Sequence, residues 1–280
     1  MCVGCNEQPT TNQQIPTLDT SDLGYALSKQ HCGGCHSYPD PSLLPQDTWK
    51  DYVLPRMGYL MGIFEHDSVR QHLLNDGKAR KHLLAMDVFP KQRTIDTQSW
   101  IHINNYYLEN APETLEASSR SEISEELPLF EVKYPNTRLS PPSTTMVSIL
   151  DDNKLLVADA HTNGLLVFDQ RLDLLQVAKV GEAATMTIQQ PEAYLVTVMG
   201  SFSPTDQTLG KLVSLPRSTN QSTKIILDGL QRPVHTSMAD FDANGLDDLV
   251  VCEFGKWTGA LNLYVNLGQD QYQKRTLING

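Results

Sequence analysis

The spacing of hydrophobic residues changes once along the chain, near Pro112. Between residues 20 and 107 the apolar positions recur at intervals of three and four, which is typical of amphipathic helices. From about residue 130 onward they come in short runs rich in β-branched residues, which is typical of strands. Residues 113–127 are rich in Glu and Ser and read as a linker. We therefore expect a helical domain at 20–112 and a β domain at 128–280.

Four helices are expected in the first domain. The last one carries Trp100, Ile103 and Tyr107 at spacings of three and four, so that an aromatic face can pack on the first helix, and Pro112 ends it. The expected helices cover approximately 20–31, 46–58, 67–84 and 97–108.

In the second domain the apolar runs recur in three groups, at about 142–180, 182–232 and 235–277. This period and the richness in strands match the blades of a β-propeller. Three blades cannot close a ring of the usual four to eight blades. The pattern therefore predicts an all-β, partial propeller, which is either truncated, the interpretation we favour, or completed by something else.

The strongest chemical signal is the run Cys32-Gly33-Gly34-Cys35-His36. Two thiols three residues apart at the end of a helix can add to the vinyl groups of a haem, and the adjacent His then ligates the iron. A zinc site would need two further strong ligands nearby, and a thioredoxin-like motif would need a βαβ context; the surrounding sequence provides neither. The motif predicts covalently bound haem c, with Cys32 and Cys35 as attachment points and His36 as proximal ligand.

The second axial ligand is left open by the residues alone. A Met thioether would raise the reduction potential and make an electron-transfer site, whereas an open position would permit ligand binding. Met86 lies about 50 residues after the motif, and Met57 lies between Pro55 and Gly58, which would fix the local backbone. The other candidates are Met61 and, for a bis-His site, His66, His72, His82 and His102.

Several segments together resemble a known family. Gly24, eight residues before Cys32, and the aromatic pair Tyr106-Tyr107 are similar to the crossing first and last helices of class I cytochromes c. The further segments are 41–45, 53–58 and 106–112, with Trp49 and Trp100. With them, the chain resembles bacterial proteins that fuse a cytochrome c domain to an FG-GAP/VCBS-type repeat propeller. The resemblance implies an all-α class I cytochrome c domain followed by the propeller, and it favours Met57 over Met86 as distal iron ligand.

The segment 240–248 is the second candidate site. It places oxygen-bearing residues at loop positions 1, 3, 5 and 9, a backbone carbonyl at position 7 and Gly245 at position 6, as a calcium ligand set requires. Position 12 is Val251 instead of the Glu of an EF-hand, and the segment resembles an FG-GAP repeat loop. An Asx-rich turn that holds no metal is the alternative. The candidate calcium ligands are Asp240, Asp242, Asn244, Leu246 and Asp248.

Composition and the N-terminus bear on location and partners. The 280-residue chain has a formal net charge of −11, which disfavours nucleic acid and anionic membrane surfaces and suits a basic redox partner protein. Val3-Gly4-Cys5 resembles the end of a bacterial lipoprotein signal, with Cys5 as the lipidated residue and 1–19 as a polar tether; a cytosolic start is the alternative. Because haem attachment to such a motif follows export, we expect a periplasmic or cell-surface protein whose only contact with the membrane is a lipid anchor.

These features predict an electron carrier rather than an enzyme, with the propeller docking a partner or ligand. One alternative is an extracytoplasmic oxidoreductase whose substrate site lies in the propeller and whose electrons leave through the haem. For such a site only His235 offers a residue to test. A surface-binding module in which the haem acts as a sensor is the third hypothesis.

Overall fold

The computed structural model describes residues 20–34, 36–116, 129–218 and 222–280. The chain divides into two compact units, and the division does not follow the sequence in one cut. Residues 1–65 and 90–122 form one unit, which we call the helical unit. Residues 66–89 and 123–280 form the other, which we call the sheet unit. The chain therefore crosses between the units three times.

The helical unit contains one long helix at each end and a composite helix between them. Pro55 lies inside the composite helix, where it has no N–H to donate, and a π-helical turn directly precedes α3. The Leu54 N–H bonds to the Trp49 carbonyl in this wider turn. The elements are α1 (Thr20–Cys32), η1 (Pro41–Leu43), α2 (Gln46–Thr48), the π-helical turn η2 (Trp49–Val53), α3 (Leu54–Leu60) and α6 (Thr97–Asn110).

Helices α1 and α6 cross at Gly24, as expected from the sequence. A Cβ atom at this position would lie 2.6 Å from the His102 carbonyl oxygen and 2.6 Å from the Tyr106 Cβ. Only a glycine permits such a close approach without moving a helix. Trp49, Ile103 and Tyr107 are almost fully buried next to this crossing and form the core of the unit.

The sheet unit begins with a short helical segment. A single helix was expected over 67–84, but the chain turns at Asp76 and Gly77, where Gly77 adopts a φ of +49°. A helix cannot continue through such a residue. The segment therefore contains α4 (Asp67–Leu73), η3 (Gly77–Ala79) and α5 (Arg80–Ala85).

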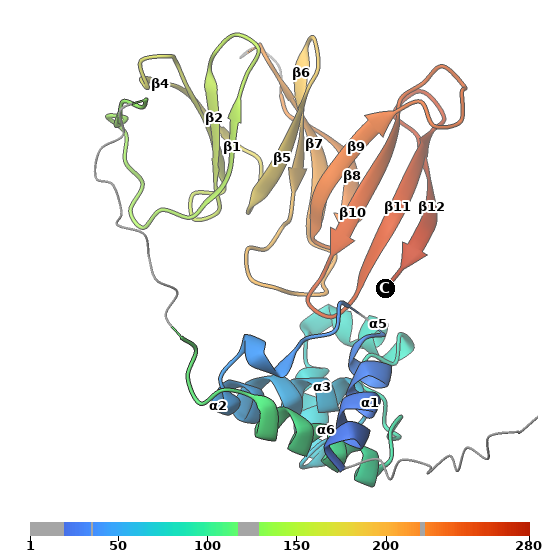
Figure 1. The fold of residues 1–280 in the computed structure, drawn as a ribbon. Helices are drawn as coiled ribbons and strands as arrows, with labels where there is room; N and C mark the ends of the chain where they lie inside the picture. Colours follow the sequence, from blue (N-terminus) through green and yellow to red (C-terminus); the bar gives the residue numbers. More distant parts are fainter. Residues whose placement is uncertain (1–19, 35, 117–128, 219–221) are drawn as a thin grey trace, which may run out of the picture. The chain divides into compact units, whose positions relative to one another are not determined.

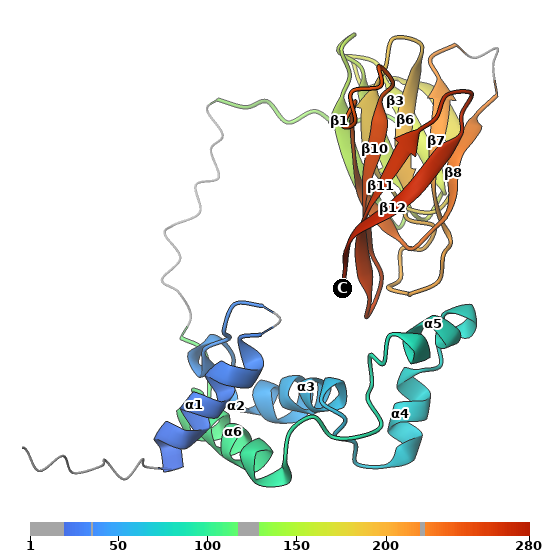
Figure 2. The same ribbon diagram turned by 90° about the vertical axis from the view of Figure 1, so that its right-hand side faces the viewer.

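Twelve strands follow in three four-stranded antiparallel sheets (Figure 1). Each sheet is a meander in which consecutive strands pair, and the three sheets correspond to the three repeated groups expected from the sequence. Strands β10–β12 of the third sheet face the viewer in Figure 2. The strands are β1 (Thr144–Ile149), β2 (Leu155–Asp159), β3 (Gly164–Phe168) and β4 (Leu174–Lys179); β5 (Ala184–Gln189), β6 (Ala193–Val198), β7 (Gly210–Pro216) and β8 (Lys224–Leu230); and β9 (Pro233–Ala239), β10 (Asp248–Phe254), β11 (Gly259–Asn266) and β12 (Tyr272–Asn279).

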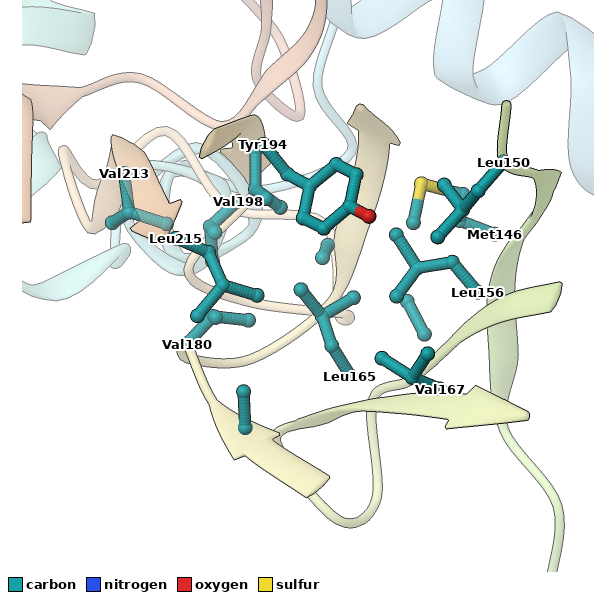
Figure 3. Packing of buried hydrophobic residues seen from close by; sticks show 14 residues of the cluster. Met146, Leu150, Leu156, Leu165, Val167, Val180, Tyr194, Val198, Val213 and Leu215 are labelled. Atoms are coloured by element: carbon teal, nitrogen blue, oxygen red, sulfur yellow. The ribbon is translucent and has the colours of Figure 1, made fainter. Parts of the chain in front are cut away.

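Hydrophobic side chains fill the space between neighbouring sheets. Leu156 and Leu165 of the first sheet meet Val196 of the second in a cluster whose labelled members point toward one another in Figure 3. A second cluster joins Leu212 of the second sheet to Val251 of the third. Burial of these faces orders the three sheets as one stack.

Polar contacts hold the helical segment 66–89 on loops of the sheets. The Asp76 carboxylate accepts bonds from the Thr205 hydroxyl at 2.9 Å and from the Asp206 N–H at 2.8 Å. The Phe89 ring packs edge-on against Trp257, with centroids 5.0 Å apart. These partners lie more than 120 residues away in the sequence, so that local pattern could not predict them.

The expected fold class is therefore wrong. The chain is mostly β, with three antiparallel sheets, and its helices do not form one all-α class I cytochrome c domain followed by an all-β region. Residues 66–89, which were assigned to the helical domain, belong to the unit that carries the sheets. The tertiary contacts of Asp76 and Phe89 override the helical periodicity that suggested a single domain.

Candidate functional site

A cavity of about 200 Å³ lies in the helical unit. Cys32, at the last residue of α1, and His36 line it from one segment, and Met57 of α3 lines it from another. The remaining lining residues are apolar or aromatic: Pro39, Leu44, Trp49, Val53, Leu54, Trp100 and Tyr107. The cavity thus brings together three of the residues that the sequence singled out.

One ring nitrogen of His36 is engaged in a hydrogen bond. Its Nδ1 lies 2.7 Å from the carbonyl oxygen of Ser37, and an Nδ1–H donor there leaves Nε2 with a lone pair. The side chain is exposed, so no desolvation opposes binding of a metal. A His in this tautomer has the form that an axial iron ligand requires.

Cys32 is half-buried and close to an aromatic hydroxyl. Burial raises the pKa of its thiol, and the hydrogen bond with Tyr107 opposes this increase in part. Burial next to Cys32 and Tyr38 also raises the pKa of Tyr107, which stays protonated and able to donate. Cys35 falls outside the described residues.

Two hydrogen bonds fix the loop that follows the motif. The Tyr107 hydroxyl donates to the Pro39 carbonyl at 2.7 Å, and the Trp49 Nε1–H donates to the Pro41 carbonyl at 2.8 Å. Both rings are nearly fully buried, with centroids 4.5 Å apart. The sequence analysis did not assign this role to the two aromatic residues.

The methionine candidates are separated by the structure. Met57 lies in the cavity wall, and Met61 ends α3 and packs on the core of the helical unit. Met86 follows α5 in the sheet unit, where its sulfur lies 3.7 Å from the Asn279 side-chain nitrogen. The cavity lining therefore includes Met57 together with Cys32 and His36, and it does not include Met86.

The histidine candidates lie away from the cavity lining. His66 precedes α4, His72 is in α4 and His82 is in α5, all within the sheet unit. His102 is in α6 at the crossing with α1. His235 is exposed on β9, opposite Cys252 of β10.

The donor set of the cavity suits a c-type haem. A thiol at a helix end, an imidazole with a free Nε2 and a thioether share one apolar site, which is the combination expected for a thioether-linked, His/Met-ligated iron. The cavity is smaller than the roughly 300–1,000 Å³ of small-molecule sites. A porphyrin would therefore require the cavity to widen.

The acidic loop between β9 and β10 forms a second cluster. One carboxylate oxygen from each of Asp240, Asp242 and Asp248 lies within 4.8 Å of the others. The Asn244 N–H donates to both Asp240 and Asp242 at 3.1 Å, and the Gly245 N–H donates to Asp240 at 2.9 Å. These bonds curl the loop so that its carboxylates converge.

Two of the loop's candidate ligands are held differently. Asp248 is fully buried and accepts bonds from the Phe241 N–H and the Asn266 N–H. The Leu246 N–H donates to the Asn244 side-chain oxygen at 2.8 Å, and its side chain is exposed. The loop thus has the oxygen atoms that a hard cation prefers.

Cys5 lies outside the described residues. In the part of the chain that the structure describes, we find no helix with the length and hydropathy of a membrane span. No protein-family model matches the chain.

Proposed function

We propose that this protein transfers single electrons through one c-type haem held by the helical unit. Cys32 and Cys35 would be the attachment points, His36 the proximal ligand and Met57 the distal ligand. The observation that carries the proposal is that Cys32, His36 and Met57 line one apolar cavity, although Met57 is 21 positions after His36.

When bound, the haem would supply a one-electron couple. The chain's own residues would set its environment. Trp49, Leu54 and Tyr107 exclude water, which favours the less charged state of a buried group. The Nδ1–H bond of His36 to Ser37 would fix the ring orientation and make Nε2 more basic.

The attachment motif and the net charge bear on the location of the protein and on its redox partner. Because haem attachment to this motif follows export, we propose an extracytoplasmic location, with Cys5 as a lipid anchor. The net charge of −11 would attract a basic redox protein at long range.

For the acidic loop we propose calcium as the ligand of Asp240, Asp242, Asn244, Asp248 and the Leu246 carbonyl. The convergence of three carboxylates within 4.8 Å supports this assignment. Its role would be to stiffen the turn between β9 and β10.

The test is the absorption spectrum of the full chain, oxidised and reduced, after production with a c-type maturation system. We expect covalent haem with a low-spin spectrum and the charge-transfer band of a Met–iron bond. Met57→Ala should abolish that band, and Met86→Ala, the matched control, should keep it. Absence of covalent haem would refute the proposal, and loss of the band in Met86→Ala alone would refute the ligand assignment.

A further inference from the structure

The helical segment 66–89 differs in charge from the rest of the molecule. The chain has a net charge of −11, whereas this segment has four basic residues and three acidic ones, which gives +1. One of its acids, Asp76, has both carboxylate oxygens bonded to Thr205 and Asp206. The segment therefore brings basic side chains to an otherwise acidic unit.

A polar cavity of about 260 Å³ lies where this segment meets the sheets, wholly within the sheet unit. Lys78 and His82 line it from the helical segment, and Lys274 lines it from β12. Two buried acids, Asp206 and Glu253, also lie in its wall. Which ligand the cavity could take depends on which of these groups still have unused hydrogen-bonding capacity.

Asp206 is held mainly through one of its two oxygen atoms. Its Oδ1 accepts bonds from the Thr258 N–H at 3.0 Å, the Thr258 hydroxyl at 2.9 Å and the Gln231 side chain at 3.1 Å. The Trp257 N–H is shared between Oδ1 at 3.1 Å and Oδ2 at 3.2 Å. Four donors of the protein thus hold this buried carboxylate in place.

Glu253 is similarly engaged. It accepts bonds from the Gln231 N–H and the Asn262 side chain, both at 2.6 Å, and from the Tyr264 hydroxyl at 3.1 Å. Lys274 reaches it only at 3.5 Å, which is the outer limit of a hydrogen bond. Three neutral donors therefore hold this buried carboxylate at shorter distances than Lys274, the cation with which it forms an ion pair.

The lysines, in contrast, keep donors available. Both lysines are exposed: in the described residues no hydrogen bond or ion pair involves the Lys78 ammonium, whereas the Lys274 ammonium pairs with Glu253 at 3.5 Å and lies 5.7 Å from the centroid of the Tyr264 ring. An ammonium offers three N–H donors and no acceptor. Beyond the ion pair of Lys274, both ammonium groups therefore still have N–H donors available at the cavity.

We propose that this cavity binds a small monocarboxylate anion between Lys78 and Lys274. The ammonium groups would pair with the carboxylate, and His82, Gln207 and Thr208 would face the rest of the ligand. The charges of Asp206 and Glu253 disfavour a dianion in the same space. This site is separate from the haem cavity, and the inference does not rest on the proposed haem.

The experiment is a calorimetric titration of the full chain at low salt with lactate, inorganic phosphate and glycerol as probes. We expect saturable binding of lactate, weakened about tenfold by Lys78→Ala and by Lys274→Ala through loss of a charged hydrogen bond. Lys81→Ala is the matched control, because Lys81 is an exposed cation of α5 outside the cavity lining. This variant should bind lactate within about twofold of the original chain, since it removes the same charge without touching the site.

Three results would overturn the proposal. Lactate could show no saturable binding up to high millimolar concentration. Lys81→Ala could weaken binding as much as Lys78→Ala does, which would mean non-specific attraction. Tighter binding of phosphate or glycerol than of lactate would show that the ligand class is wrong.

Discussion

The two units place their polar and reactive side chains in different surroundings. In the sheet unit, the buried acids Asp206 and Glu253 accept hydrogen bonds from the protein's own donors. In the helical unit, Cys32, His36 and Met57 line an apolar cavity. The comparison teaches that buried charge in the sheet unit is held by internal hydrogen bonds, whereas the ligand-type side chains of the helical unit converge on an apolar space.

The largest expected effect tests how much the internal hydrogen bonds of Asp206 stabilise the sheet unit. Asp206→Ala would leave the N–H groups of Trp257 and Thr258 without their acceptor, at a cost of about 1–3 kcal/mol for each buried donor. We expect the free energy of unfolding of the sheet unit to fall by about 3 kcal/mol or more. Urea denaturation followed by tryptophan fluorescence measures it.

Asp206→Asn is the matched control, because the amide keeps one carbonyl oxygen for the same donors. It should lose clearly less stability than Asp206→Ala. Equal losses would mean that the charge, and not the hydrogen bonding, holds the loops together.

The next effect concerns the crossing in the helical unit. Gly24→Ala would place a methyl group 2.6 Å from the backbone of α6 and force α1 away from it, which costs about 1–3 kcal/mol. Circular dichroism during thermal unfolding should show a lower midpoint, and covalent haem should be incorporated less efficiently. Gln30→Ala, on the exposed face of α1, should leave the midpoint unchanged; an equal drop would contradict the role of the close approach.

A calcium effect of similar size is expected where the free ion is far above its dissociation constant, and a smaller one at lower concentrations. Ligand binding to the folded state alone adds about 2.7 kcal/mol when the free ion is at 100 times its dissociation constant. Addition of a calcium chelator should therefore lower the unfolding midpoint of the original chain. Asp242→Asn should reduce this difference, and a chelator-insensitive midpoint in the original chain would show that the loop holds no calcium.

The smallest effect concerns the Cys32 thiol before haem attachment. Burial raises its pKa, so that alkylation should require a higher pH than for a free cysteine. Tyr107→Phe removes the nearby hydroxyl that partly opposes this increase in pKa, and it should shift the alkylation profile to still higher pH. Peptide mass spectrometry resolves this site from the other cysteines, and a shift toward lower pH would contradict the assigned contact.

The parts of the fold that depend on local pattern were predictable. Gly24 and the aromatic face of α6 indicated their crossing, and the three groups of strands were visible as repeats. The assignment of residues 66–89 was not predictable, since it depends on Asp76 meeting Thr205 and on Phe89 meeting Trp257. The spacing of hydrophobic residues within 66–89 contains no information about those contacts.

The candidate site shows the same limit. The motif identified Cys32 and His36, but position along the chain left Met57 and Met86 as competing ligands. The π-helical turn before α3 and the break at Gly77 decide where the two methionines lie, and both depend on backbone geometry. The polar cavity at Lys78 and Lys274 has no sequence signature, because 196 positions separate its two cations.

The three crossings between the units impose an order on biosynthesis. Residues 66–89 leave the ribosome more than 110 positions before Thr205, Asp206 and Trp257, on which they pack. Domains generally fold as units while the N-terminal part emerges first. The segment is therefore synthesised well before the loops on which it packs, and its full set of contacts can form only after Trp257 has been added to the chain.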